Sequence, residues 1–210
     1  GGVGPGVLAS SIVSSRLLGA IAADHGLEHR TTLTGFKWIA RVPDLVFGYE
    51  EAIGYCCDPA HIRDKDGITA AVTMALLADS LRIDGRTIQD VLDSFADRFG
   101  LHATAPVTFR VEDVGLISAA MQQLRSTAPT ELAGSEVVSV IDLNEGYDGL
   151  PPTDGLMLFT ATNDRVIIRP SGTEPKLKCY LEVILPGGTW EEAHKRLDAI
   201  GEELRGVIGL

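Results

Sequence analysis

The pattern that most constrains the fold lies near the C-terminal end of the chain. Apolar residues there recur at every second position, at Leu177, Cys179, Leu181, Val183 and Leu185. A period of two is typical of a β-strand with one buried face. A second apolar run, residues 166–168, precedes this strand by a short loop. We therefore expect two strands of one sheet that hold both ends of the loop.

The loop between these two runs is rich in hydrogen-bond donors and reads Arg-Pro-Ser-Gly-Thr-Glu-Pro-Lys from Arg169 to Lys176. Arg169 offers a planar fork of donors, and Lys176 adds a point charge. Ser171 and Thr173 offer hydroxyls, while Gly172 lets backbone N–H groups approach a ligand closely. A phosphate, with three acceptor oxygens and about −1.5 to −2 charges, suits these groups. The alternative is a polar hairpin loop whose hydroxyls bond only to their own backbone.

Charge and composition limit the partners of such a loop. The 210-residue chain has a formal net charge of −11. This charge opposes broad attachment to nucleic acid or to an anionic membrane, so a phosphate ligand would be small and held by a local cationic pocket. We find no apolar run of about 18 residues and no N-terminal leader, so we expect a cytoplasmic protein without a membrane partner.

The cysteines and histidines give no spacing that points to a metal or a disulfide framework. Cys56 and Cys57 are adjacent and Cys179 lies on a predicted strand, so we expect reduced, buried thiols. The five histidines are scattered, without the short spacing of paired metal ligands. We therefore assign no metal ligand in this chain.

Repeated strand, loop and helix units fill residues 1–100. Mostly apolar or alternating runs at 7–13, 29–34 and 45–47 predict strands, and Ser14 or Ser15 is placed to cap the helix that follows the first. Apolar spacing predicts helices over 70–81 and over 88–95. This alternation predicts a layered α/β domain with a mainly parallel sheet.

The pattern restarts at Leu101 to Pro106, which we interpret as a domain boundary and a hinge. Residues 101–210 then form a second predicted domain. Its strands are expected at 107–109, 137–141, 156–161, 166–169 and 177–185, with helices over 116–124 and 190–207. That order predicts an α+β domain, a sheet with helices on one face.

Further candidate ligand residues follow predicted strands of the first domain. Glu50 and Glu51 come after the run at 45–47, where open α/β sheets bind ligands, although a solvated acidic turn is the alternative. Lys37 stands in Gly35-Phe36-Lys37-Trp38, and the alternative is a surface lysine beside core residues. Lys65 stands in Asp64-Lys65-Asp66-Gly67, where Asp66 could simply cap a helix within a solvated charge run.

Together these motifs resemble the α-D-phosphohexomutase superfamily of phosphoglucomutases and phosphomannomutases. The loop from Arg169 to Lys176 resembles the phosphate-binding loop in the last domain of that family. Residues 48–55 resemble its sugar-recognition loop, in which a Glu at the position of Glu50 accepts hydrogen bonds from two ring hydroxyls. The form Glu-Glu-Ala-Ile-Gly is more similar to the phosphopentomutase and phosphoglucomutase-2 branch. Lys37 and Lys65 stand in segments that resemble cleft-lining parts of the same family.

The resemblance implies most of domain 3, incomplete at its N-terminus, over residues 1–100, and domain 4 over residues 101–210. The chain also lacks an initiating Met and opens Gly-Gly-Val-Gly-Pro-Gly, as a piece of a longer protein would. The implied partners are a sugar phosphate and the N-terminal domains of the same polypeptide.

The reaction implied by the resemblance interconverts sugar 1-phosphate and sugar 6-phosphate of glucose or mannose. It proceeds through a phosphoserine and a bisphosphate intermediate, with Mg²⁺ as cofactor and hexose 1,6-bisphosphate as activator. The phosphoserine and the Mg²⁺ ligands would lie in the missing domains. We therefore expect no catalytic residue in this chain, and no mutase activity from this fragment alone.

Other interpretations remain open. A phosphopentomutase or a hexose-1,6-bisphosphate synthase would share the same motifs. A non-catalytic module that binds a sugar phosphate or a nucleotide would use both loops only to sense a ligand, and a plain interaction domain would bind no anion at all.

Overall fold

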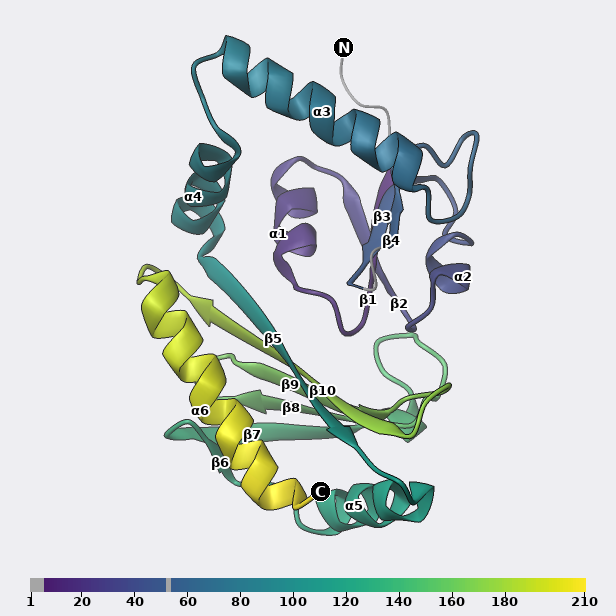
Figure 1. The fold of residues 1–210 in the computed structure, drawn as a ribbon, viewed down its shortest axis with the longest axis vertical. Coiled ribbons are helices and arrows are strands. Elements are labelled where there is room, and N and C mark those ends of the chain that lie inside the picture. Colours follow the sequence, from purple (N-terminus) through teal and green to yellow (C-terminus); the bar gives the residue numbers. More distant parts are fainter. Residues whose placement is uncertain (1–5, 52–53) are drawn as a thin grey trace. The chain divides into compact units, whose positions relative to one another are not determined.

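The computed structural model describes residues 6–51 and 54–210 and divides into two compact units, Gly1–Phe99 and Gly100–Leu210. Each unit contains its own β-sheet (Figure 1). We describe the units one after the other.

The first unit is built on a mixed, mostly parallel sheet. Its strands, in the order β2-β1-β3-β4, are β2 (Glu28–Thr32), β1 (Val7–Ser11), β3 (Leu45–Glu50) and β4 (Gly54–Cys56). β1 is buried along its whole length and pairs in parallel with β2 and β3. Helices α1 (Leu17–Asp24) and α2 (Phe36–Ile39) contact these strands. The predicted α/β architecture is therefore confirmed for this unit.

The predicted helix caps are only partly correct. The N-cap position of α1 is Arg16 rather than Ser14 or Ser15, although the Ser15 hydroxyl accepts a hydrogen bond from the Leu17 N–H at 3.2 Å. Asp66 does cap α3 (Gly67–Ile83), because its carboxylate accepts a hydrogen bond from the Ile68 N–H at 3.0 Å.

The strand predicted at 45–47 continues as far as Glu50 and turns back antiparallel into β4, which the sequence pattern did not predict. Gly48 lies opposite Cys56, and Glu50 lies opposite Gly54. Glu50 is therefore the last residue of a strand rather than part of a loop beyond it. The sequence did not indicate this extension, because Gly48 interrupts the apolar run and glycine is uncommon inside strands.

Packing explains the glycine at position 48. A Cβ atom there would lie 2.4 Å from Ile39 Cγ2 and 3.4 Å from the Ala9 carbonyl oxygen. Ile39 and Ala9 are both fully buried in the core of this unit. Only a residue without a side chain allows α2 to pack this closely on β3.

We predict that Gly48→Ala lowers the free energy of unfolding by between about 1 and 3 kcal/mol, the usual cost of overpacking a core. Chemical denaturation of the parent and the variant measures this loss. Gly67→Ala is the matched control, because a Cβ atom there meets nothing within 4 Å and alanine favours the helix. Equal stabilities of parent and Gly48→Ala would contradict the packing argument.

Most apolar residues of α3 are exposed. Of its residues only Leu81 is buried, whereas Ile68, Met74 and Leu76 are more than half exposed. Apolar residues occur all around this helix, so their spacing does not define a face. Within the first unit, β4 is the main element that α3 contacts. Helix α4 (Ile88–Phe99) follows it and has no buried residue.

The second unit is an antiparallel sheet with helices. The strands follow the order β5-β10-β9-β8-β7-β6: β5 (Leu101–Arg110), β10 (Lys176–Leu185), β9 (Arg165–Pro170), β8 (Leu156–Thr160), β7 (Ser135–Asp142) and β6 (Glu131–Leu132). Helix α5 (Val114–Ser126) and the short 3₁₀ helix η1 (Leu143–Glu145) lie between strands in the chain. The predicted α+β class is confirmed for this unit.

The segment from Leu101 to Pro106 is not a hinge. It forms the first part of β5, and each of its residues has a partner on β10, from Leu185 opposite Leu101 to Tyr180 opposite Pro106. A strand paired along its whole length cannot act as a flexible joint, because bending it would break the ladder hydrogen bonds.

Helix α6 (Trp190–Ile208) covers one face of this sheet. Its predicted apolar stripe is buried at Ala193, Leu197, Ile200 and Leu204, whereas Trp190 at the start of the predicted stripe is exposed. Gly201 lies against Val107 of β5 and Leu181 of β10, so these residues mark the covered face. Burial on this face raises the pKa of the Cys179 thiol to about 12. That α5 shares this face stays a prediction.

Cys56, Cys57 and Cys179 are free cysteines, and Cys57 is half-buried rather than buried. No helix within residues 6–51 and 54–210 is long and apolar enough to cross a membrane.

Candidate phosphate-binding and sugar-binding sites

The hairpin between β9 and β10 holds the loop that the sequence singled out. Arg169 and Pro170 end β9, and Lys176 begins β10. The Ser171 N–H donates to the Lys176 carbonyl at 2.8 Å, and the Lys176 N–H donates to the Glu174 carbonyl at 2.7 Å. The Val111 N–H, just beyond β5, donates to the Pro175 carbonyl at 3.2 Å. A sheet therefore fixes the loop from both sides, as predicted.

The loop presents its small residues to solvent. Gly172 and Thr173 are exposed and Ser171 is half-buried. A Cβ atom on Gly172 would meet nothing within 4 Å, and its backbone does not have the positive φ that favours glycine. Neither packing nor backbone conformation requires glycine here, which leaves room for a group that approaches the backbone from outside.

Two cations near this loop were not singled out by the sequence analysis. In the antiparallel register, Arg110 of β5 lies opposite Lys176, and Lys178 of β10 lies opposite Arg169 of β9. Partners directly opposite each other point to the same face of a sheet. The alternating burial of β10, in which Leu177 and Cys179 are fully buried, puts the even-numbered residues on the other face. No local sequence signal could reveal Arg110, which lies far from the loop in the chain.

In the first unit, Glu50, Lys65 and Phe36 converge on Gly54. A Cβ atom there would lie 2.9 Å from Glu50 Cγ and 3.0 Å from both Lys65 Cδ and Phe36 Cδ2. The Asp66 N–H donates to the Tyr55 carbonyl at 2.8 Å, which ties the start of α3 to β4. The glycine thus allows a carboxylate and a lysine from separate segments to lie side by side. Glu50 is half-buried.

A pocket of about 510 Å³ brings Lys37 and Lys65 together. Its charged lining residues are Lys37, Arg41, Arg63, Asp64 and Lys65, so cations outnumber carboxylates. Lys65 Nζ lies 5.1 Å from the centre of the Phe36 ring and 3.4 Å from Asp64 Oδ1. This pocket can attract an anion.

Arg63 also has a structural role at this pocket. Its guanidinium donates to the carbonyls of Ala40 at 3.0 Å and Val42 at 2.7 Å. These carbonyls follow α2, so Arg63 supplies hydrogen-bond donors at the C-terminal end of that short helix. Lys37 is exposed and lies 5.5 Å from the centre of the Trp38 ring.

Glu51 differs from Glu50 in its contacts. The Ser14 hydroxyl donates to Glu51 Oε2 at 2.8 Å, and Ser14 Oγ lies 2.9 Å from Ser11 Oγ. Ser11 and Ser14 are buried at the end of β1. The contact anchors the turn that follows Glu50 to the central strand. Ala52 and Ile53, which belong to the motif quoted for this turn, lie outside the described residues.

The fold also brings a serine and a histidine together that are distant in sequence. Ser10 Oγ lies 3.0 Å from His29 Nε2, and burial lowers the pKa of His29. Such a pair resembles a nucleophile with its base. Ser10 is only 2% exposed, however, so its hydroxyl is not accessible to a substrate. We interpret the pair as a structural contact between β1 and β2.

Among the described residues, no three His, Cys, Asp or Glu side chains gather closely enough to hold a metal ion. The side chains present here therefore do not fit the Mg²⁺ that the family resemblance implies.

Comparison with known families agrees with this geometry. Residues 1–99 match the family described as "Phosphoglucomutase/phosphomannomutase, alpha/beta/alpha domain III". Residues 121–186 match the C-terminal domain of the same family. The two matches fall in the two units, in the order found in the chain.

Relatives support the same assignment. A "Probable phosphomannomutase" of Haemophilus influenzae is 39% identical over 204 residues, which is 97% of this chain and 41% of the relative. A "Phosphopentomutase" of Mus musculus is 34% identical over 223 residues, covering 95% of this chain and 36% of the relative. The crystal structure of the phosphoglucomutase parafusin from Paramecium, in its open form, has the same fold, with a TM-score of 0.74 at 20% identity, over 96% of this chain and 37% of that one.

The chain belongs to the phosphohexomutase family and comprises its domains III and IV. It spans about two fifths of the length of these relatives.

Proposed function

We propose that this chain is the substrate-binding part of a phosphosugar mutase that interconverts the 1-phosphate and 6-phosphate of glucose or mannose. The reaction would proceed through a phosphoserine and a bisphosphate intermediate. The observation that carries the proposal is the β9–β10 hairpin, which presents Arg169, Ser171, Gly172, Thr173 and Lys176 on a sheet-anchored loop.

The loop would hold the phosphate that is not reacting. Arg169 can form two parallel charge-assisted hydrogen bonds to one phosphate, and the backbone at Gly172 is open to it. Ser171 and Thr173 supply hydroxyl donors, and Lys176 supplies charge. A rigid mount favours binding because fewer groups must be ordered when the ligand arrives.

Glu50 would hold the sugar ring. A carboxylate has two acceptor oxygens and no donor, which suits a pair of neighbouring hydroxyls. Lys65, beside Glu50 at Gly54, and Lys37 would line the same part of the site. Glu51 would contribute as an anchor through Ser14, so its effect on the sugar is indirect.

The remaining machinery would come from the N-terminal domains of the same polypeptide, which would hold Mg²⁺ and the phosphoserine. Hexose 1,6-bisphosphate would act as activator. The exposed apolar residues of α3 support the proposal that a neighbouring segment of the complete protein covers them. Relatives named phosphopentomutase and glucose 1,6-bisphosphate synthase also match this chain, so a phosphopentomutase or a hexose-1,6-bisphosphate synthase is the second candidate.

The test is Arg169→Ala in the complete enzyme. Loss of a charge-assisted contact from an exposed loop should weaken ground-state binding by about 1.5–3 kcal/mol, which raises KM roughly ten- to hundred-fold. Steady-state kinetics with glucose 1-phosphate measure the effect, and thermal unfolding should be unchanged.

Arg86→Ala is the matched control, because it removes the same charge from an exposed residue between α3 and α4. Unchanged kinetics of Arg169→Ala together with a lower melting temperature would show that the loop is only structural.

A further inference from the structure

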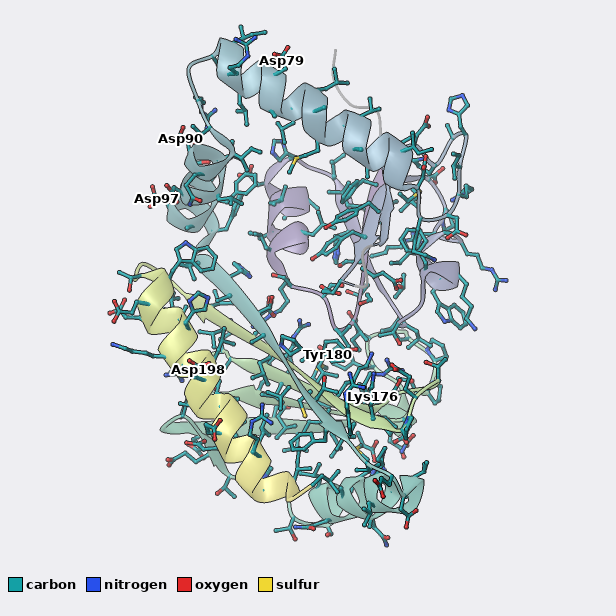
Figure 2. The ribbon with its side chains drawn as sticks, in the orientation of Figure 1. Asp79, Asp90, Asp97, Lys176, Tyr180 and Asp198 are labelled. Atoms are coloured by element: carbon teal, nitrogen blue, oxygen red, sulfur yellow. The ribbon has the colours of Figure 1, made fainter. Side chains whose placement is uncertain are left out.

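The face of the second sheet next to the loop concentrates positive charge in an acidic protein. Arg110 lies opposite Lys176, and Lys178 lies opposite Arg169, so two like-charged pairs stand side by side on strands β5, β10 and β9. Like charges directly opposite each other destabilise a sheet. By contrast, the acidic residues Asp79, Asp90, Asp97 and Asp198 lie on exposed helix surfaces, while Lys176 lies at the loop end of β10 (Figure 2).

One carboxylate offsets this repulsion. Glu174, within the loop, forms an ion pair with Lys176. The hydrogen bond from Lys176 holds the pKa of Glu174 below its ordinary value, and the charges of Lys176, Lys178 and Arg110 lower it further. The charges that act on Glu174 therefore include three of these four cations. Within residues 6–51 and 54–210, Arg110, Arg169 and Lys178 form no ion pair of their own.

We propose that the Glu174 carboxylate is a built-in substitute anion, which a ligand phosphate displaces from Lys176, and that Arg110 and Lys178 are further phosphate-binding residues. This inference rests on the proposed function of the loop. A phosphate carries more charge than a carboxylate and has three oxygens, so it can contact more of these cations at once. The loop keeps its backbone conformation after the exchange, because the backbone hydrogen bonds of Ser171 and Lys176 do not involve the Glu174 side chain.

A substitute anion lowers the affinity of the loop for phosphate, because the incoming phosphate must first displace the carboxylate from its ion pair. It also keeps the cations from repelling one another when the site is empty. Glu174 would thus set the affinity of the loop for phosphate, while Arg110 and Lys178 would increase it.

The experiment titrates inorganic phosphate, at constant ionic strength, into the 210-residue chain and follows the amide NMR signals of Ser171, Gly172 and Thr173. Glu174→Gln should bind phosphate roughly threefold to tenfold more tightly than the parent, the change expected for one unit charge near a water-exposed site. Lys178→Gln and Arg110→Gln should each weaken binding by a similar factor. Glu131→Gln on β6 is the control, because it removes the same charge from the opposite edge of the sheet.

The outcomes separate this inference from the proposed function. If Arg169→Ala loses phosphate binding but Glu174→Gln binds like the parent or more weakly, the inference is overturned and the loop remains a phosphate site. If Arg110→Gln and Lys178→Gln leave the affinity unchanged, those residues are not ligands. If the parent and all variants bind no phosphate, both the inference and the proposed function fail.

Discussion

Purified residues 1–210 are expected to bind a hexose phosphate weakly and to convert none of it, even with Mg²⁺ and a hexose 1,6-bisphosphate activator. The loop at Arg169 and the carboxylate of Glu50 can position a ligand, but phosphoryl transfer also requires a nucleophile and charge stabilisation at the reacting phosphate. No metal-binding cluster occurs in the part of the chain that the structure describes. The Ser10 hydroxyl is buried. A coupled assay that follows formation of glucose 6-phosphate from glucose 1-phosphate measures the expected absence of turnover.

Weak binding is expected because exposed charges are screened by water and salt. The amide signals of the loop should therefore shift with ligand and shift less as salt is added. Turnover by the isolated chain, once contaminating mutase is excluded, would contradict the assignment of the chemistry to other domains. Ser10→Ala then decides between explanations, since a loss of that turnover would identify the Ser10–His29 pair as its source.

Glu50→Gln in the complete enzyme is expected to lower kcat by about 100-fold while phosphate binding changes little. The amide keeps the shape of the side chain, but it replaces one acceptor oxygen with a donor and removes the charge that strengthens hydrogen bonds to ring hydroxyls. A sugar held in a shifted orientation reacts slowly, even when its phosphate is bound. Steady-state kinetics and phosphate titration of the same variant separate the two effects.

Glu51→Gln is the matched control for this experiment. It makes the same chemical change one residue further on, where the side chain accepts a hydrogen bond from Ser14. The amide oxygen can still accept that bond, so turnover should stay near that of the parent. Equal losses in both variants would show that the acidic turn acts as a unit, and parental turnover by Glu50→Gln would remove Glu50 from the sugar site.

The local pattern was sufficient for the elements that frame the phosphate loop. Residues that alternate from Leu177 to Leu185 form β10, and the apolar stripe of α6 is buried from Ala193 to Leu204. Both results follow from the same physics. Each element buries one face, and its period along the chain records which residues lie on that face.

The same reasoning failed where a face is not defined by one element alone. Helix α3 is apolar on all sides, so its spacing could not show that Leu81 alone is buried. The segment from Leu101 to Pro106 was interpreted as a hinge, but pairing with β10 makes it part of a strand. Gly48 interrupted the pattern of β3, although the close approach of Ile39 requires a glycine there.

The sequence by itself therefore determined the two fold classes and the loop from Arg169 to Lys176. Only the tertiary structure decided which distant residues join these features. The register between β5 and β10 places Arg110 beside Lys176, and the turn after β3 places Glu51 against Ser14. The physical reason is that periodicity is a property of neighbouring residues, whereas register and packing depend on the partner that each element meets.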